Sequence, residues 1–432
     1  MRKIGILLGL AILMAQSNVV CAKSLEDILK EKGVITEADY KEVQNSLPVT
    51  YKPGEGISLS TQDGKFRTTI GGMMQLRYTF MGIDDVNNRS NGQKNDSSKM
   101  EFKRVKLIVG GNAFTKNLTY NVTLNFSNIT GGSTTNGGIL ENAYVNYRLF
   151  NELLVRAGQD KVEFGREWLA PASALEFVDQ SHVTSAFTPT YDTGVRLLGK
   201  VADGILTYSI AGTGGVGQNT FRATSNNAFS ARITVNPFGE MKNSQSDVEY
   251  STKPLLSIGS GFYHTTINKS AAATYENNSL GFAKKNTGWF GINSGMQKFA
   301  TSEDIDFNMY GFDAAFKWRG LFVTGEYLAG QADGDTSKYT LRAHGFYTQA
   351  GYFIIPKSVE LAYRYSYLDP NRDVKNDHWI ENTVGVSWYI YQHNLKLQAD
   401  YTNIHKQSAI ASTAGSKATD DNQARVQVQL LF

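Results

Sequence analysis

The sequence predicts an all-β fold: a sixteen-stranded antiparallel transmembrane β-barrel with an inward-folded third loop, preceded by a short N-terminal helical segment. Three observations lead to this prediction. Apolar and polar residues alternate from Phe66 onward, short and long connections follow each other in turn, and the last strand ends on the aromatic residue Phe432. Alternation alone fits a sandwich or a barrel, but only an outer-membrane barrel explains the alternating lengths of the connections.

Residues 1–22 have the composition of a secretory signal peptide. Two basic residues precede an apolar run, and the segment closes on Val20, Cys21 and Ala22. This order predicts export and cleavage after Ala22. Val20 is a poor residue before a lipidated cysteine, so lipid attachment at Cys21 is the less favoured alternative. Cleavage removes the single cysteine of the chain and leaves a mature protein that folds without disulfides.

Residues 23–56 are the expected periplasmic helical segment and linker. Two capping pairs, Ser24 with Asp27 and Thr36 with Asp39, predict two short helices with a glycine stop between them. Two roles remain open for this segment, a solvated spacer and a docking device. The chain elsewhere has no run of 18 apolar residues, which excludes a helical membrane protein.

Residues 57–432 are assigned to the barrel domain. In the stretch LTYNVTLNFS, residues 118–127, apolar residues occupy every even position and polar residues every odd position. The last stretch, RVQVQLLF, has the same two faces, and a terminal strand is stable only when both of its edges are paired. We therefore expect it to close the barrel against the first strand, with Phe432 as the signal that the outer-membrane assembly machinery reads.

The connections between the predicted strands differ in length in a regular way. Short connections fall at residues 115–117, 150–151, 202–204, 319–320, 355–358 and 391–394. Longer polar ones lie between them, at residues 81–98, 128–138, 160–189, 267–303 and 405–422. Short turns on the periplasmic side and long loops outside give this pattern. Residues 237–252 are the exception, because this connection should be short and is not.

The polar faces of the predicted strands carry more basic than acidic residues. If the apolar faces meet lipid, the polar faces surround an aqueous channel whose positive charge concentrates anions. The alternative is that these charges pair with loop carboxylates and only keep the lumen hydrated. The residues that we assign to the anion path, in the lumen and its constriction, are Arg104, Lys106, Arg156, Lys161, Arg166, Arg196, Lys200 and Arg232.

Residues 160–189, the predicted third outer loop, mix apolar and charged side chains. A fully exposed loop would not carry apolar groups such as Phe164, Trp168 and Phe177. We expect this loop to fold into the lumen, pack on the wall and form the constriction. Its expected cations are Lys161 and Arg166, and its expected anions are Glu163, Glu167, Glu176 and Asp179.

Other chemistries find little support in the sequence. Residues 212–217 match G-x-G-x-x-G, but no apolar helical face follows, as a nucleotide site requires. The 6 histidines lack metal-ligand spacing, and no serine lies in G-x-S-x-G. The net charge of +3 gives no reason to expect nucleic acid. We expect no cofactor, no metal and no enzymatic activity.

The chain resembles the phosphate-selective porin O and P family. The similar stretches include FKRVKLIVGGNAFTKNLTYNVTLNFS, LENAYVNYRLFNELLVRAGQDKVEFGRE and NTVGVSWYIYQHNLKLQADYT, and they run in family order from about residue 66 to residue 432. The resemblance implies a sixteen-stranded porin, usually a trimer, with an inward third loop and passive diffusion that favours phosphate or other anions. Two cations of the family pattern are absent, because Gln180 follows Asp179 and Tyr191 precedes Asp192.

These observations predict an outer-membrane porin of a Gram-negative type of cell. It would allow passive diffusion of small hydrophilic solutes with a preference for anions, phosphate possible among them. The alternative function is a structural or adhesive barrel with a blocked lumen, whose outer loops, such as residues 267–303, bind a partner. The expected partners are outer-membrane lipid, small anionic solutes, two further copies in a homotrimer and the outer-membrane assembly machinery.

Overall fold

The computed structural model describes residues 25–39, 49–84, 96–129, 139–220, 226–268, 280–284, 287–292, 298–300, 302–410 and 418–432. The predicted signal peptide and the capping residue Ser24 lie outside these ranges. The chain divides into two units, residues 1–50 and residues 51–432. The linker that the sequence predicts up to residue 56 therefore ends within the second unit.

The first unit contains helix α2 (Leu25–Glu31). Gly33 follows it with φ of +69°, a backbone conformation that glycine adopts without strain. Beyond this stop, the predicted pair Thr36 and Asp39 is present. The Asp39 amide donates to Thr36 Oγ1 at 3.1 Å, and the Thr36 amide donates to Asp39 Oδ2 at 2.9 Å. Each side chain thus satisfies a backbone N–H of the other at the start of a helical turn.

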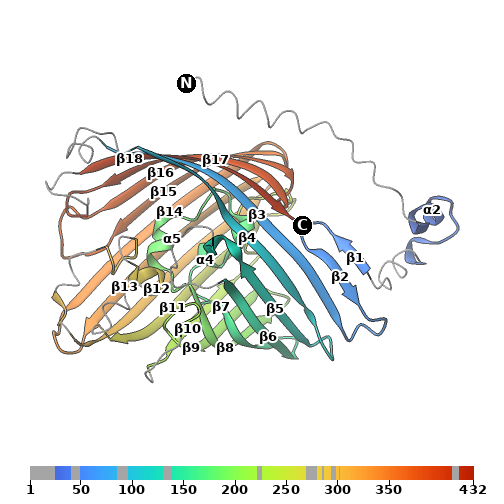
Figure 1. The fold of residues 1–432 in the computed structure, drawn as a ribbon, viewed down its shortest axis with the longest axis horizontal. Coiled ribbons are helices and arrows are strands. Elements are labelled where there is room, and N and C mark those ends of the chain that lie inside the picture. Colours follow the sequence, from blue (N-terminus) through green and yellow to red (C-terminus); the bar gives the residue numbers. More distant parts are fainter. Residues whose placement is uncertain are drawn as a thin grey trace. The chain divides into compact units, whose positions relative to one another are not determined.

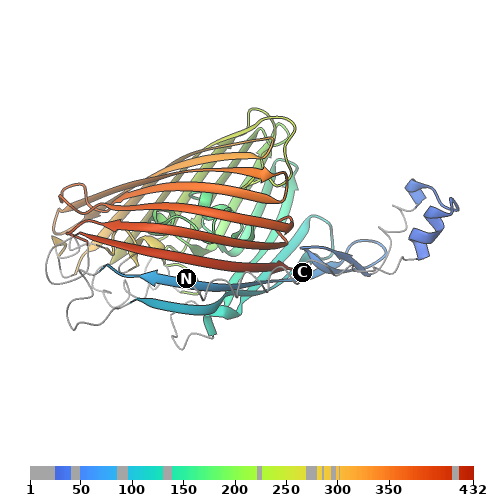
Figure 2. The ribbon, with the colours of Figure 1, turned by 90° about the horizontal axis from the view of Figure 1, so that it is seen from above.

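The eighteen strands of the described part of the chain belong to one sheet. They are β1 (Val49–Lys52), β2 (Gly56–Ser60), β3 (Arg67–Gly82), β4 (Ser97–Asn112), β5 (Leu118–Asn125), β6 (Leu140–Phe150), β7 (Leu153–Lys161), β8 (Tyr191–Val201), β9 (Leu206–Thr213), β10 (Ala228–Val235), β11 (Leu255–Asn268), β12 (Asp304–Trp318), β13 (Leu321–Gly334), β14 (Thr340–Ile355), β15 (Val359–Asp369), β16 (Trp379–Tyr391), β17 (Leu395–Lys406) and β18 (Thr419–Leu431). Figures 1 and 2 show β3–β18 as one tilted wall. Short helical turns lie between strands: η3 (Phe126–Ile129), α4 (Arg166–Leu169), η4 (Ala172–Ala174), α5 (His182–Phe187) and η6 (Gly281–Ala283).

In the described part of the chain, sixteen antiparallel strands, β3–β18, form a closed barrel because β18 pairs with β3 and β9 with β10. This confirms the predicted sixteen-stranded antiparallel barrel. No helix among the described residues is long and apolar enough to cross a membrane. Large apolar side chains on the outer face are exposed, for example Met100, Tyr147, Phe312 and Val428. Such a face is suited to contact with lipid. The alternating apolar and polar residues of the sequence are therefore the outward-facing and inward-facing residues of the barrel strands.

The connections also follow the predicted lengths. Arg319 and Gly320 alone link β12 to β13, with φ of 48° and 82°. Two positive φ values are typical of a type I′ turn, whose twist matches that of the flanking strands. The connection between β10 and β11 is long, as the sequence shows, although it lies at the same end of the barrel as this tight turn.

Phe432 pairs the end of the chain with β3, the first strand of the barrel. Its amide donates to the Gly72 carbonyl at 3.1 Å, and the Gly72 amide donates to the Phe432 carbonyl at 2.7 Å. A Cβ atom on Gly72 would lie 2.7 Å from the Phe432 ring, so the missing side chain leaves room for the aromatic group. The last residue therefore extends the pairing of β18 with β3 by two hydrogen bonds, and neither strand has a free edge.

Deletion of Phe432 should reduce assembly into the outer membrane, because it removes this pairing and the terminal aromatic group. The measurement is the fraction of heat-modifiable, folded barrel in outer-membrane fractions. Phe432→Tyr is the matched control, since it keeps both the aromatic ring and the backbone bonds. Wild-type assembly of the shortened chain would show that the terminus lacks the assigned role.

Candidate functional site

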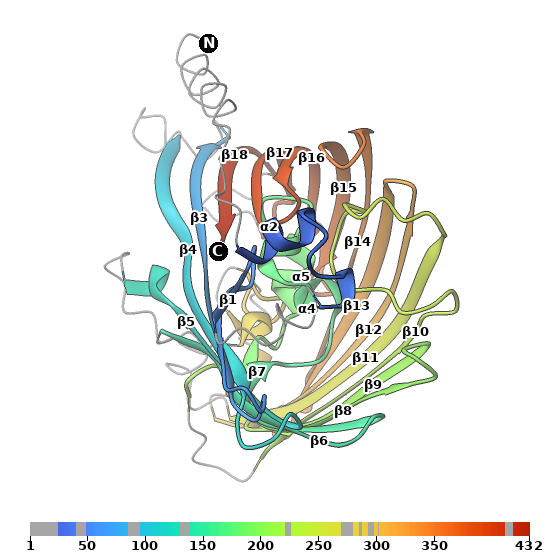
Figure 3. The same ribbon diagram turned by 90° about the vertical axis from the view of Figure 1, so that its right-hand side faces the viewer.

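The third outer loop, residues 162–190, lies inside the barrel. Figure 3 shows α4 and α5 within the ring of strands. Local signals set the bounds of the two helices of this loop. Pro171 follows the end of α4, and Ser181 caps the start of α5 by accepting a hydrogen bond from the Thr184 amide at 3.0 Å. The stretch between them is irregular, so its backbone groups need partners from elsewhere.

Inward-facing side chains of the wall supply these partners. The Lys396 ammonium donates to the Leu175 carbonyl at 2.7 Å, and Arg77 donates to the Val178 carbonyl at 2.8 Å. Further bonds run from Gln75 to Ala172, from Arg232 to Phe164, from Ser387 and Gln398 to Glu176, and from the amides of Arg166 and Glu167 to Glu326. The loop is therefore fixed to strands around much of the barrel.

Glu167 is the centre of the buried loop network. Its Oε2 accepts hydrogen bonds from the Ser181 amide at 3.0 Å, the Ser181 hydroxyl at 2.8 Å and the Thr184 hydroxyl at 2.6 Å. Its Oε1 lies 3.4 Å from Arg364 Nη1 and 3.2 Å from Gln245 Nε2. One carboxylate thus joins α4, the start of α5 and the wall.

The long connection between β10 and β11, residues 236–254, supplies Gln245 and packs on the inward loop. The Gln245 amide donates to the Ala174 carbonyl at 2.9 Å, and Gln245 Oε1 accepts from the Glu176 amide at 2.8 Å. Ser246 donates to Glu360 of the wall at 2.7 Å. Sequence reasoning missed this second inward segment. Its signal was the length of a connection that the barrel pattern required to be short.

An aromatic cluster covers another part of the inner wall. Phe282, Trp289 and Phe290 of the β11–β12 connection are buried against Phe187 of α5 and Phe307 of β12. The inward-facing positions of β12, β13, β14 and β17 are buried beneath these segments. Positions on β4–β7 are mostly half-buried instead. The inner surface that solvent reaches therefore lies along β4–β7.

Four of the eight predicted path residues lie on this accessible side. The side chains of Arg104 and Arg156 are each 17% exposed, and that of Lys106 is 10% exposed. Lys161, at the end of β7, is half-buried and donates to two loop carbonyls. Lys106 forms an ion pair with Glu141, and Arg156 forms one with Asp160.

The other four predicted path residues do not line this accessible side. Arg196 is fully buried and donates to the carbonyls of Gly158, Asp160 and Asp192. Buried Arg166 and Arg232 share Asp313, at 3.8 and 2.7 Å, and Lys200 pairs with Glu240 in an exposed position. Through these contacts Arg166, Arg196 and Arg232 support the loop and the wall, although their partners are wall groups and backbone carbonyls and not the loop carboxylates of the alternative. Lys200 is far more exposed than the rest.

The accessible side also contains a group of four charged residues, Asp179 and the three cations around it, which we call the Asp179 cluster. Asp179 lies 2.8 Å from Arg77 Nη1, 3.7 Å from Lys103 Nζ and 3.6 Å from Arg104 Nη2. Burial opposes ionisation, but Lys103, Arg77 and Arg104 outweigh it and hold the pKa of Asp179 well below its usual value. Three cations surround one carboxylate, so the cluster has a net positive charge.

Lys103 was absent from the predicted path because strict alternation turns it away from the lumen. Gln75 pairs with Arg104 and Leu76 with Phe102, so Lys103 is an extra residue on β4. Such a β-bulge breaks the period of two and redirects a side chain. No pattern in the sequence marks the bulge.

The protein matches the model of the phosphate-selective porin O and P family over residues 73–432. Among solved structures it is similar to an anion-selective porin from Comamonas acidovorans, with 11% identity, a TM-score of 0.53, and coverage of 84% of this chain and 99% of that one. A loop L8 deletion mutant of OmpT, an outer membrane protein of Vibrio cholerae, matches with 10% identity, a TM-score of 0.50 and coverage of 84% and 99%. No curated protein matches. The family match covers most of the chain and the fold agrees with it, so the protein belongs to the phosphate-selective porin O and P family and is an outer-membrane porin.

Proposed function

We propose that this porin allows passive diffusion of small hydrophilic solutes, without changing them chemically, and that it favours anions. The observation that carries the proposal is the Asp179 cluster, where Arg77, Lys103 and Arg104 surround one carboxylate beside the accessible wall. An uncompensated positive charge in a narrow aqueous path raises the local concentration of anions. The fold neighbour from Comamonas acidovorans, an anion-selective porin, is consistent with this preference.

Arg104, Lys106, Arg156 and Lys161 are the path residues that we retain from the sequence. Arginine suits an anion path because its planar fork shares hydrogen bonds with an oxyanion and stays charged at any working pH. Several moderate contacts in series also suit conduction, since a permeating ion must leave each site. Lys106 and Arg156 are balanced by Glu141 and Asp160. The preference should therefore be weak to moderate.

A general anion pore fits the structure better than a dedicated phosphate site. Tyr191, which stands where the family pattern has an arginine, donates its hydroxyl to Glu141 at 2.9 Å. Gln180, at the other altered position, donates to the Glu167 carbonyl at 2.9 Å. Both side chains are engaged in the loop and wall, and neither adds a positive charge. Phosphate would then pass as one anion among several.

The first test is whether the lumen conducts at all. In planar bilayers we expect purified protein to give steady open levels, because solvent reaches the inner surface of β4–β7. The second candidate function, a structural or adhesive barrel, rests on the three inward segments that cover the opposite wall. A barrel that shows no steady open level, although it is folded and inserted, would favour that function.

We also propose that the chain is exported through cleavage after Ala22, assembled by the outer-membrane machinery with Phe432 as its signal, and active as a homotrimer in outer-membrane lipid. Family membership supports the trimer, and the composition of residues 1–22 supports the cleavage. Native mass spectrometry of detergent-extracted protein should show three mature chains. Only monomers, or chains that retain residues 1–22, would contradict these two points.

A further inference from the structure

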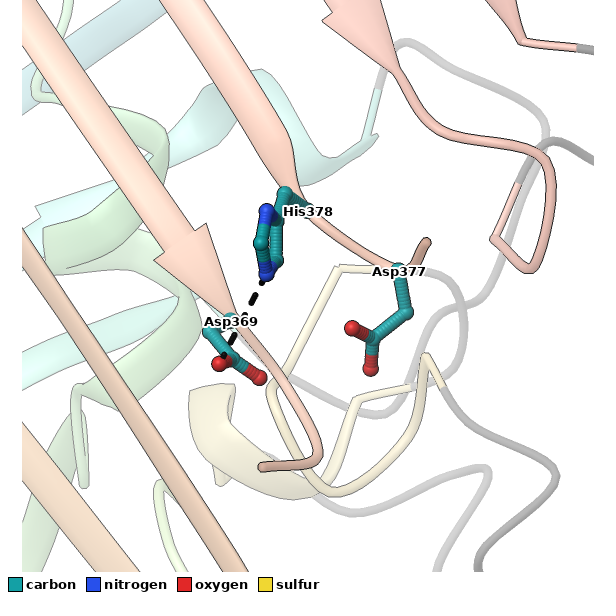
Figure 4. A group of neighbouring side chains, drawn as sticks. All are labelled: Asp369, Asp377 and His378. Atoms are coloured by element: carbon teal, nitrogen blue, oxygen red, sulfur yellow. Dashed lines mark ion pairs between the residues drawn. The ribbon is translucent and has the colours of Figure 1, made fainter. Parts of the chain in front are cut away.

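A group of carboxylates and imidazoles lies at the outer end of the barrel, away from the Asp179 cluster. Asp369 ends β15, and Asp377 and His378 lie in the connection from β15 to β16. Figure 4 shows their three side chains directed toward one another. His344 of β14 is paired with Asp369 across the sheet and lies beside this group of three, with its Nδ1 3.9 Å from Asp369 Oδ2. Three separate segments therefore bring their polar side chains together here.

The distances suit ligands of one ion better than hydrogen bonds. Asp369 Oδ2 lies 3.8 Å from His378 Nε2 and 3.9 Å from His344 Nδ1. In a tetrahedral Zn²⁺ site with bonds of about 2.0–2.2 Å, two ligand atoms lie about 3.3–3.6 Å apart. The ligand atoms of Asp369, Asp377 and His378 all lie within 4.8 Å of one another. The separations of Asp369 from the two histidines exceed the tetrahedral value by about 0.2–0.6 Å, which rotation of the side chains can close.

Asp377 supplies the second, independent observation. Its side chain is fully buried, and neither carboxylate oxygen has a well-aligned hydrogen-bond partner; only the backbone amides of Asn371 and of Asp377 itself approach the carboxylate. Among the described residues, no lysine or arginine forms an ion pair with Asp369 or Asp377. His344 Nδ1 is likewise buried without a hydrogen bond. A buried carboxylate with only local backbone donors and no paired cation is neutralised either by a proton or by a bound cation, and a metal ion held by the neighbouring ligand atoms would do so here.

We propose that Asp369, Asp377, His378 and His344 bind a divalent transition-metal ion, with Zn²⁺ as the best-fitting member of the class. Two imidazoles and two carboxylates are ligands that Zn²⁺ takes in four-coordinate sites. Ca²⁺ requires six to eight oxygen ligands. This site has two carboxylates, and Oδ1 of Asp369 already accepts a hydrogen bond from the Asn371 amide at 3.2 Å.

The backbone around the site is held in place by neighbouring segments. The His378 amide donates to Gln407 Oε1 at 3.1 Å, and the Arg372 amide donates to the Arg342 carbonyl at 2.9 Å. His378 is 34% exposed, which gives an ion an entry path. A bound ion would fasten the outer connection between β15 and β16 to β14. Asp369, Asp377 and His378 lie within residues 369–378 but do not have the spacing of a common metal motif, and His344 joins them only because β14 pairs with β15.

The test is a Zn²⁺ titration by calorimetry of the full-length mature protein in detergent, after treatment with a chelator. We expect one Zn²⁺ per chain. Asp377→Asn should weaken the affinity by at least about tenfold, the scale of loss for weakened metal ligation. Asp373→Asn is the matched control, because it makes the same change at an exposed position of the same connection and should keep wild-type affinity.

His378→Gln, checked for folding by heat modifiability, provides a second variant, and it should also lose affinity. Co²⁺ bound to wild-type protein should give the intense visible absorption of a tetrahedral site, a readout that needs no variant. The proposal is overturned if folded wild-type protein shows no saturable Zn²⁺ binding. It is also overturned if Ca²⁺ binds more tightly than Zn²⁺, or if Asp377→Asn binds Zn²⁺ as the wild type does.

Discussion

Glu167→Ala should widen the pore and make its current noisy, because this carboxylate joins the inward loop to the wall. The substitution removes three hydrogen bonds to Ser181 and Thr184 and the contact with Arg364. Arg364 is 1% exposed, so a buried guanidinium would lose its ion-pair partner. Loss of one partner of a buried ion pair costs about 3–5 kcal/mol. We expect a larger single-channel conductance and a lower unfolding temperature.

Glu152→Ala is the control for this experiment. Glu152 is exposed in the turn between β6 and β7, and its substitution should leave conductance and stability unchanged. Conductance and noise are measured in planar bilayers, and stability is measured by the temperature at which the folded band disappears on a gel. A Glu167→Ala pore with wild-type conductance would mean that the loop does not form the constriction.

Lys103→Ala with Arg104→Ala should reduce the ratio of chloride to potassium permeability. These two cations are the exposed part of the Asp179 cluster, with side chains 36% and 17% exposed. A unit charge about 4 Å from an ion contributes about 1 kcal/mol in water, which corresponds to a factor of about five in local concentration. Without them, Asp179 and Arg77 remain as a neutral pair. We expect the ratio to fall by up to about fivefold for each charge at low salt, and by less at high salt.

Lys242→Ala controls for a general loss of positive charge. Lys242 is exposed in the β10–β11 connection and pairs there with Glu249. Its removal should leave the permeability ratio unchanged, because that surface charge is screened by salt and by its partner. An equal fall in both variants would mean that the whole molecule, and not the Asp179 cluster, sets the preference.

The barrel could be predicted because the features that produce it, alternation within each strand and the lengths of the connections, can be read from short stretches of sequence. Alternation records which face of a strand meets lipid, and the lengths of the connections record which side of the membrane they face. The final aromatic strand follows from the same rule, since Phe432 pairs with Gly72 and removes the last edge. The unusual length of the connection at residues 236–254 could also be seen in the sequence, but the reason for that length could not. That segment packs on the inward loop through Gln245, a contact between distant parts of the chain.

The path residues were predicted less completely, because facing inward does not mean facing water. Alternation places Arg196 and Arg232 inside the barrel correctly, yet both are buried against loop or wall. Which wall the loops cover depends on tertiary packing that no short-range pattern records. Lys103 was missed because a bulge changes the period at one residue. The burial of Asp377 among ligands from three segments is likewise a property of the folded sheet alone.

Anion preference through a lumen with excess positive charge is the central claim, and the reversal potential of the wild-type pore tests it most directly. The measurement places purified protein in a planar bilayer across a KCl gradient at neutral pH. A reversal potential of the sign that chloride dictates, reduced in the Lys103→Ala, Arg104→Ala variant, is the predicted result. A potential of the sign that potassium dictates would contradict the account, because the carboxylates Asp160, Glu141 and Asp179 would then control the path.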